Sequence, residues 1–399
     1  MKSFNFIDKI KINIKTYTLI IALFIIWLLF GFLTGWIFFS PRNLSNLFRQ
    51  MTIVSFLSIG MTLVIITGNI DLSVGSLTGF ISAIAAYLQA VMLPPLLSGI
   101  FPNLSIVALG ILSTIIAIVT CLLAGLLIGI YQGYIIAYLK VPAFIVTLGG
   151  MLIFRGGVFG ITQGKTVVPI ENSLRWIAQG YVPKNLGILV AVIAIMFIFL
   201  MSIQSRKQKR QYGFELKPLT YDLLIASAYS VLVLGSTLNA NKYRGIQNPV
   251  LIMIVIAIMI TYLSNNTRFG RYVYALGGNM EATKLSGINV QSVVFKVFIL
   301  MGLLSGVAGI VLTGYVAAGT IGGGVNYELS AIAGCVIGGV SLMGGKGTII
   351  GALIGALIMA SLENGMSVMN MGVFWQYIIK GLVLILAVYV DIASKKNES

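Results

Sequence analysis

The stretch NTRFGRYVYALGGNMEATKLSGINV (residues 266–290) is the most polar long interruption in the second half of the chain, and both of its flanks are apolar. Across all 399 residues, 58% are hydrophobic and only 9% are charged. The apolar residues fall in blocks of about seventeen or more, which is long enough for a helix to cross a bilayer. The sequence therefore predicts a single all-α domain over residues 1–399, a polytopic integral membrane protein whose polar stretches connect helices.

We expect about ten to twelve transmembrane helices, some of them broken or re-entrant. The polar residues of 68–76 and the Gly344–Gly347 turn are the two places where a break is expected. The amino-terminal residues 1–16, the basic loop 204–220 and the tail 392–399 are rich in Lys and Arg. Because such residues are enriched on the cytoplasmic side of a membrane, these three segments and both termini are assigned to the inside.

Composition also excludes several classes of function. The 26 Lys and Arg residues outnumber the ten acidic ones, but most of them flank apolar blocks, so no nucleic-acid partner is expected. Histidine is absent and the two cysteines lie in apolar runs, so neither a metal site nor any other cofactor is predicted. GITQGKT (residues 160–166) has one residue too few between its glycines for a phosphate-binding loop, so the chain is not expected to hydrolyse ATP.

The stretch 266–290 predicts a short helix on the cytoplasmic surface. Gly277 and Gly278 are expected to form a flexible turn. Asn279 can cap a helix that runs through residues 281–285, and Gly287 can end it. Such a helix is suited to docking in a cleft of another protein. From these residues alone, a polar linker with a surface helix remains the alternative.

The polar break at residues 68–76 has two interpretations. Asp71, Asn69 and Ser73 lie between apolar segments, which is typical of a kinked helix that lines a pathway. Alternatively, Asp71 caps the following helix at the membrane surface. Arg155, inside another apolar block, either extends to the interface or pairs with an acid in the membrane. Gly125, Gly129 and Gly133 recur every four residues and predict a close helix–helix contact.

Four separated motifs carry a resemblance to a known family. They are GMTLVIITGNIDLSVGS (60–76), VPAFIVTLGGMLIFRG (141–156), ALGGNMEATKLSGI (275–288) and SAIAGCVIGGVSLMGGKGTIIGALIGALI (330–358). Together and in this order they resemble the permease subunits of bacterial ABC importers for monosaccharides, the ribose, arabinose and xylose group. The resemblance runs from about residue 48 to the end. The extra material between about 165 and 245 is most similar to the xylose-type permeases.

The resemblance implies specific roles and partners. In that family a cytoplasmic coupling segment docks on a separate ATP-binding subunit, and the positions here that match it are Gly278, Asn279, Glu281, Ala282 and Gly287. Relatives usually carry a second alanine where this chain has Thr283, which we expect to add a hydroxyl to the docking surface. The resemblance also implies a permease homodimer, a periplasmic or extracellular sugar-binding protein and a place in the bacterial inner membrane with its lipid.

A neutral sugar needs sparse polar contacts along its path. The candidates are the polar residues that lie in or beside apolar blocks, namely Asn69, Asp71, Ser73, Glu328, Glu363 and Asn364. Glu328 and Glu363 can also be ordinary helix-end residues near the outer surface. An ion-gradient-driven secondary sugar carrier is the alternative function, because Arg268–Arg271 is similar to a basic loop motif of such carriers, although Thr267 replaces the usual acid. A membrane enzyme is disfavoured because no cluster of acids or activated nucleophile is present.

Overall fold

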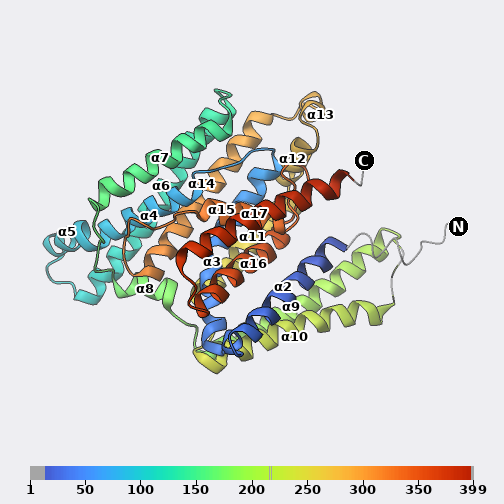
Figure 1. Ribbon diagram of the computed structural model, residues 1–399, viewed down its shortest axis with the longest axis horizontal. Helices are drawn as coiled ribbons and strands as arrows, with labels where there is room; N and C mark the ends of the chain where they lie inside the picture. Colours follow the sequence, from blue (N-terminus) through green and yellow to red (C-terminus); the bar gives the residue numbers. More distant parts are fainter. Residues whose placement is uncertain (1–13, 215, 217, 397–399) are drawn as a thin grey trace.

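The computed structural model describes residues 14–214, 216 and 218–396, and within them every regular element is helical (Figure 1). Nine described helices are long and apolar enough to cross a membrane, and three shorter apolar helices accompany them. The predicted all-α polytopic fold is therefore confirmed. The main helices are α2 (Ile14–Leu33), α3 (Pro41–Ile66), α4 (Val74–Tyr87), α5 (Leu93–Ile100), α6 (Ile106–Ala137), α7 (Ala143–Thr162), α8 (Asn172–Gln179), α9 (Lys184–Gln211), α10 (Leu219–Tyr243), α11 (Asn248–Asn266), α14 (Val290–Val316), α15 (Tyr327–Ile337), α16 (Ile349–Val368) and α17 (Val373–Lys396).

The centre of the bundle is built on α3 and α14, whose side chains are mostly buried. α14 packs along α6, α4 and α3. A Cβ added to Gly129 of α6 would lie 2.6 Å from the Phe298 carbonyl oxygen of α14, and one added to Gly125 would lie 2.5 Å from that of Gly302. These glycines bring the two backbones into direct contact, as their spacing predicted.

A hairpin of α9 and α10 lies at the edge of the bundle, where α10 contacts α3 (Figure 1, lower right). Most side chains of α9 and α10 are not covered by other parts of the chain, so their apolar surface is available to lipid. Near the loop that joins the two helices, Arg206 and Asp222 form an ion pair at 2.6 Å. The segment 204–220 is therefore only partly a loop, because α9 continues to Gln211 and α10 begins at Leu219.

Two elements break the pattern of full-length helices. α3 ends at Ile66, the chain turns through Gly68 at φ +76°, and α4 begins only at Val74. α15 has 11 residues, which at about 1.5 Å per residue covers roughly half of a hydrocarbon core of about 30 Å. The starts of α4 and α15 meet each other, since a Cβ on Gly75 would lie 2.6 Å from the Gly324 carbonyl oxygen.

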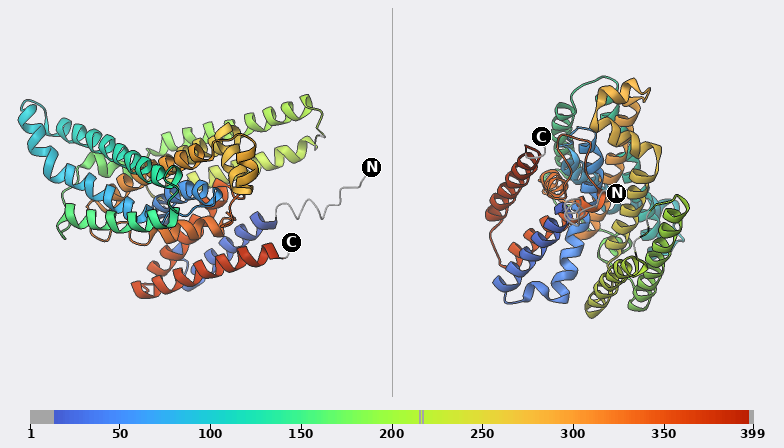
Figure 2. Two further views of the ribbon diagram at one scale, coloured as in Figure 1. Left: turned by 90° about the horizontal axis from the view of Figure 1, so that it is seen from above. Right: turned by 90° about the vertical axis from the view of Figure 1, so that its right-hand side faces the viewer.

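The ends of the described chain share one end of the bundle. The start of α2 and the end of α17 point the same way as the segment between α11 and α14, and all views agree on this (Figures 1 and 2). α17 continues to Lys396, so the first part of the predicted tail 392–399 is helical. Residues 1–13 and 397–399, which carry the rest of both predicted terminal segments, lie outside the described residues.

Candidate functional site

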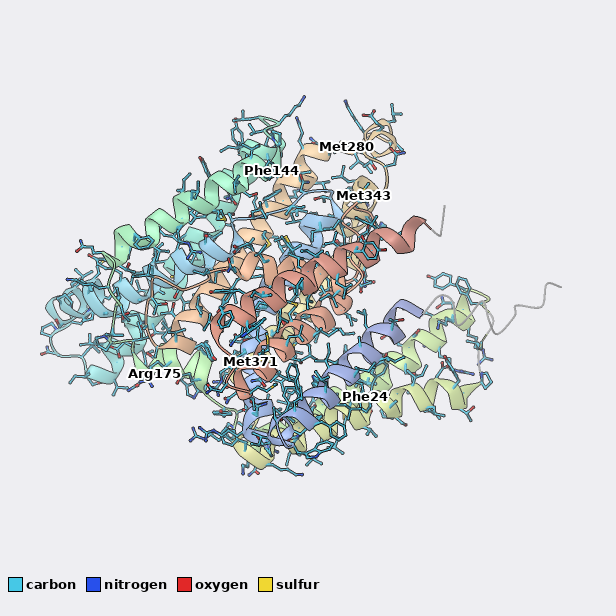
Figure 3. The ribbon with its side chains drawn as sticks, in the orientation of Figure 1. Phe24, Phe144, Arg175, Met280, Met343 and Met371 are labelled. Atoms are coloured by element: carbon cyan, nitrogen blue, oxygen red, sulfur yellow. The ribbon has the colours of Figure 1, made fainter. Side chains whose placement is uncertain are left out.

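The stretch 266–290 forms two short helices, α12 (Arg268–Gly278) and α13 (Met280–Leu285). Figure 3 shows Met280 at the same end of the bundle as Met343, away from Arg175 and Met371. The Asn279 side chain begins α13 by accepting a hydrogen bond from the Ala282 N–H at 2.9 Å. Gly287, at φ +77°, ends this segment. The predicted cap and stop are thus confirmed, because both depend only on neighbouring residues.

α12 is held firmly against the rest of the bundle. The Ile66 carbonyl at the end of α3 accepts a hydrogen bond from the Gly345 N–H at 3.0 Å, and Gly277 sits against the same carbonyl. A Cβ on Gly277 would lie only 1.6 Å from that oxygen. The Tyr274 hydroxyl also donates to the Gly347 carbonyl at 2.8 Å. The expected flexible turn at Gly277 and Gly278 is therefore wrong, since both residues complete α12 and Gly277 is needed for close packing.

α13 presents most of its side chains to the outside. Met280, Glu281, Ala282 and Leu285 are exposed, and Leu285 reaches 87% exposure. Thr283 is the exception, because it is buried and its hydroxyl donates to the Asn279 carbonyl at 2.7 Å. The expectation that Thr283 adds a hydroxyl to a docking surface is therefore wrong. What remains is a capped helix that offers Glu281 and Lys284 among apolar side chains.

A second group of polar residues forms around the break between α3 and α4. The Asp71 carboxylate accepts hydrogen bonds from the Ser73 N–H at 2.8 Å and the Ser73 hydroxyl at 2.6 Å. The Gln132 amide of α6 donates to the Ser73 hydroxyl at 2.9 Å. All three side chains are buried, which places a carboxylate within the packed interior. Asp71 thus orders the turn that leads into α4, while Asn69 bonds locally to Thr67.

Two residues of this cluster were missed by sequence reasoning. Gln132 is a buried amide on α6, next to the packing residue Gly133. Thr147 of α7 is buried beside the break, and its hydroxyl lies 3.4 Å from the Ile70 carbonyl. A lone amide in an otherwise apolar helix was the available signal for Gln132, because such a group needs a partner inside the protein.

Glu328 enters the same region from the first turn of α15. Its side chain is 6% exposed, and its Oε2 lies 2.0 Å from where a Cβ on Gly75 would be. The alternative of an ordinary helix-end residue near the outer surface is therefore wrong for Glu328. Oε2 of Glu328 and Nη1 of Arg155 are both buried without a hydrogen-bond partner, and the Arg155 charge acts on Glu328 electrostatically. Two polar atoms of opposite charge are thus left unsatisfied near the starts of α4 and α15.

The remaining two candidates lie elsewhere, on α16. Asn364 accepts from the Asn43 amide at 2.8 Å and donates to Gln50 at 3.3 Å, which ties α16 to α3. Glu363 forms an ion pair with Lys380 of α17. The structure therefore brings Asp71, Ser73 and Glu328 together and separates Glu363 and Asn364 from them. Within the described residues, no group of acidic and cysteine side chains is arranged to hold a metal ion.

The comparison with known proteins now identifies the family. Residues 43–388 match the family described as branched-chain amino acid transport system / permease component. The chain belongs to this family. As such a permease component, it is a multi-pass inner-membrane transport subunit rather than an enzyme, and it works with other components of a transport system.

Individual relatives narrow the resemblance further. The xylose transport system permease protein of Haemophilus influenzae is 43% identical over 97% of this chain and 98% of its own length. That of Escherichia coli K12 is 40% identical over 97% and 94%. The ribose import permease protein of Escherichia coli K12 is 34% identical over 89% and 87%. The predicted resemblance to monosaccharide permeases, and to the xylose type in particular, is confirmed. No solved structure is significantly similar to the chain.

Proposed function

We propose that this permease is the membrane-spanning subunit of an ATP-driven ABC importer that moves xylose, or a closely related pentose, into the cytoplasm. The two xylose permeases at 43% and 40% identity support the choice of sugar. In this proposal two copies of the chain form a homodimer in the lipid of the inner membrane. A separate cytoplasmic subunit hydrolyses ATP, a separate sugar-binding protein delivers the sugar from outside, and both termini of the permease are cytoplasmic.

The observation that carries the proposal is the combination of an exposed α13 with a firmly packed α12. The ATP-binding subunit docks on α13, where Met280 and Leu285 offer apolar contacts and Glu281 offers a charge. Gly278, Asn279, Ala282 and Gly287 shape that surface. Thr283 contributes from inside, because its hydroxyl holds the start of the helix. A docked partner that moved α13 would move α12 with it.

The contacts of α12 give that motion a route to the interior. Gly277 touches the end of α3 at Ile66, and the chain beyond that point leads directly to Asp71. The same residue touches Gly345 in the turn that follows α15, whose other end carries Glu328. Rigid helices transmit such displacements through contiguous packing. One movement at the surface therefore reaches both elements that break the helical pattern.

The region between these elements is the proposed path for the sugar. Asp71, Ser73, Glu328 and Arg155 place polar groups at the starts of α4 and α15, and two of their atoms lack partners in the described structure. An unpaired charge at mid-bilayer costs about 2.5–3.5 kcal/mol on insertion scales. Sugar hydroxyls can satisfy such groups in passing. We place Asn69 at the cytoplasmic exit of this path as part of the proposal, whereas Glu363 and Asn364 lie apart from it on α16, bonded to Lys380 and Asn43.

Reconstitution separates this importer from a gradient-driven carrier. The permease, co-purified with its ATP-binding subunit, is placed in liposomes, and radiolabelled xylose uptake is measured with sugar-loaded binding protein. We expect uptake that requires ATP and is insensitive to collapse of the proton and sodium gradients. Uptake that persists without ATP and disappears with the gradient would instead establish a secondary carrier.

A further inference from the structure

The end of α9 carries a cluster of basic residues, here called the basic tip. Four of five consecutive positions are basic, namely Arg206, Lys207, Lys209 and Arg210. The turn between α6 and α7, by comparison, contains a single lysine. Arg206 is paired with Asp222 of α10. The other three side chains are exposed, and no ion pair joins them to an acid in the part of the chain that the structure describes.

The last carbonyl groups of α9 do not need these cations. The Tyr212 N–H donates to the Gln208 carbonyl at 3.0 Å, and the Phe214 N–H donates to the Lys209 carbonyl at 2.9 Å. Gly213, at φ +70°, makes this turn possible. Basic side chains near the end of a helix can bond its last carbonyls, but here backbone N–H groups already do so. The charges of the basic tip are therefore available to a ligand from outside the chain.

An exposed apolar stripe on α9 leads directly to two of these cations. Its members recur every three or four residues and so share one face of the helix, namely Leu189, Ile193, Met196, Leu200 and Ile203. The next positions in the same spacing are Lys207 and Arg210. α9 packs mainly along α10, and the hairpin lies at the edge of the bundle in every view (Figures 1 and 2). The stripe therefore faces lipid and ends in two positive charges.

The distance along α9 places these cations at the depth of lipid headgroups. The apolar run 186–203 spans about 27 Å at about 1.5 Å per residue, close to the roughly 30 Å of a hydrocarbon core. Lys207 and Arg210 follow within two helical turns. Tyr212 and Phe214, exposed by 74% and 65%, add aromatic rings at the level where membrane proteins usually carry them.

These features together fit one occupant, an anionic phospholipid. An Arg guanidinium can bind a phosphate through two parallel hydrogen bonds, and a Lys ammonium adds a point charge. Basic clusters at the end of a transmembrane helix attract anionic lipids. We infer that Lys207 and Arg210 bind the phosphate of an anionic phospholipid whose acyl chains lie along the apolar stripe of α9. This site belongs to the hairpin alone and does not depend on which sugar the permease carries.

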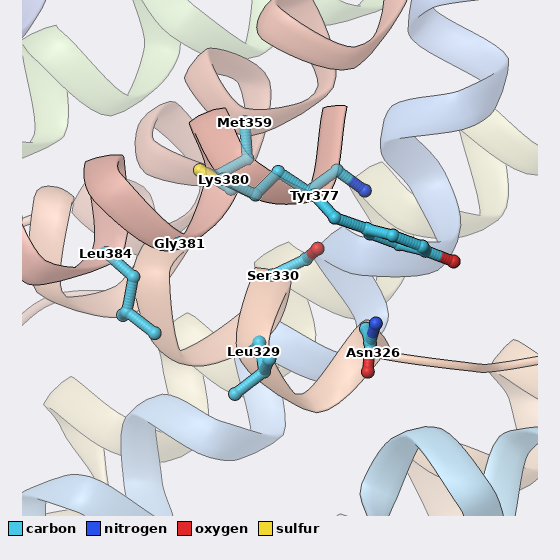
Figure 4. Close-up of a pocket in the computed structure, with 8 residues that line it drawn as sticks. All are labelled: Asn326, Leu329, Ser330, Met359, Tyr377, Lys380, Gly381 and Leu384. Carbon is cyan, nitrogen blue, oxygen red and sulfur yellow. The ribbon is translucent and has the colours of Figure 1, made fainter. Parts of the chain in front are cut away.

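The cation beside the pocket between α15, α16 and α17 is not available in this way (Figure 4). Lys380 lines that pocket, but it forms an ion pair with Glu363, and most of the pocket surface is apolar. An anion there would compete with a carboxylate that the chain itself supplies. At the basic tip, Asp222 binds Arg206 and leaves the two cations of the stripe free.

Lys207→Gln together with Arg210→Gln tests the site, because it removes both charges from exposed positions. The matched control is Lys165→Gln together with Lys242→Gln, which removes two exposed charges elsewhere. Lys165 follows α7, and Lys242 lies in the last turn of α10, at the far end of that helix from the basic tip. Each permease is purified with its ATP-binding subunit in detergent. Phosphatidylglycerol and phosphatidylcholine of equal chain length are added, and bound lipid is counted by native mass spectrometry.

We expect the unaltered complex to retain more phosphatidylglycerol than phosphatidylcholine. The double variant should lose at least about tenfold in phosphatidylglycerol retention, since each basic residue near an anionic surface strengthens binding about fivefold. The control should stay within about twofold of the unaltered complex. Equal phosphatidylglycerol retention by the double variant and the control would overturn the lipid site, and so would equal retention of the two lipids by the unaltered complex. Loss of the ATP-binding subunit from the double variant, with phosphatidylglycerol retained, would overturn it in favour of a protein-docking surface.

Salt provides a second test that needs no substitution. Raising the ionic strength from about 0.1 M to about 1 M shortens the Debye length from about 10 Å to about 3 Å, which weakens attraction between exposed charges. Retention of phosphatidylglycerol by the unaltered complex should fall over this range, while retention of phosphatidylcholine stays unchanged. Phosphatidylglycerol retention that is insensitive to salt would contradict a site built on Lys207 and Arg210. Neither test requires transport, so both remain valid if the proposed importer function fails.

Discussion

Replacing Gly277 by alanine tests whether α12 transmits force to the interior. The added Cβ would lie 1.6 Å from the Ile66 carbonyl oxygen, and real Cβ contacts essentially never fall below 3.0 Å. α12 must therefore shift by about 1.4 Å from the end of α3, because the atoms it meets are backbone atoms that cannot rotate away. Overpacking of this kind costs about 1–3 kcal/mol.

The shift also threatens a hydrogen bond. The Gly345 N–H donates to the same Ile66 carbonyl at 3.0 Å, and its loss adds about 1 kcal/mol. The combined cost of about 2–4 kcal/mol corresponds to a decrease of roughly 30- to 700-fold in the population of molecules in which α12 stays packed against the end of α3. We therefore expect xylose uptake in liposomes to fall at least tenfold while the permease still inserts and binds its ATP-binding subunit.

Gly149→Ala is the control, because Gly149 is a helical glycine of α7 whose Cβ position meets nothing within 4 Å. Its uptake is expected within about twofold of the unaltered protein. Uptake is normalised to folded protein, measured by size-exclusion chromatography and thermal unfolding in detergent. If Gly277→Ala transports as well as Gly149→Ala, the packed contact at Ile66 has no part in coupling and the reasoning fails.

Three further substitutions test the two clusters. Glu281→Lys should insert and fold normally but uncouple ATP hydrolysis from uptake, because it removes the acid of α13 and, with the exposed Lys284, leaves the helix with two positive charges. Unimpaired uptake would count heavily against docking there. Asn279→Ala removes the cap of α13 at a cost of about 1 kcal/mol, so ATPase stimulation should fall roughly fivefold, and Asn279→Asp, which can cap equally well, should restore it. Asp71→Ala leaves the Ser73 N–H and hydroxyl without their acceptor and should lower the unfolding temperature. Asp71→Asn keeps one oxygen acceptor, so its unfolding temperature should fall less. An equal fall in both variants would mean that the carboxylate charge itself matters.

Local features of this chain could be predicted from sequence because local physics decides them. The length of the apolar blocks sets the helices, and the Asn279 cap and the Gly287 stop require only residues within one turn. The glycines at 125, 129 and 133 announced a close contact by their spacing alone. What the spacing could not supply was the partner helix, α14, which lies more than 150 residues further along the chain.

The features that were mispredicted depend on distant segments. Gly277 looks like half of a flexible turn until the end of α3 is placed against it. Thr283 looks like a surface hydroxyl until its bond to the Asn279 carbonyl turns it inward. Glu328 looks like a helix-end acid because nothing in its neighbourhood reveals that α15 begins inside the bundle. Burial of a polar side chain is a tertiary property, so sequence could nominate these residues but not assign their surroundings.

The two broken elements explain why polar groups gather where they do. A helix that starts inside a membrane leaves its first N–H groups without intrahelical partners, and lipid cannot satisfy them. At α4 the Asp71 carboxylate accepts from the Ser73 N–H, whereas at the start of α15 Glu328 packs against Gly75 with Oε2 left without a partner. The same places are therefore polar, closely packed and interrupted, which supports the proposal that the sugar path runs between them. Because Ile66 and Gly345 both contact α12 close to these elements, we propose that the surface segment acts on both breaks at once, so that a substitution that frees α12 should disable transport without disturbing either polar cluster.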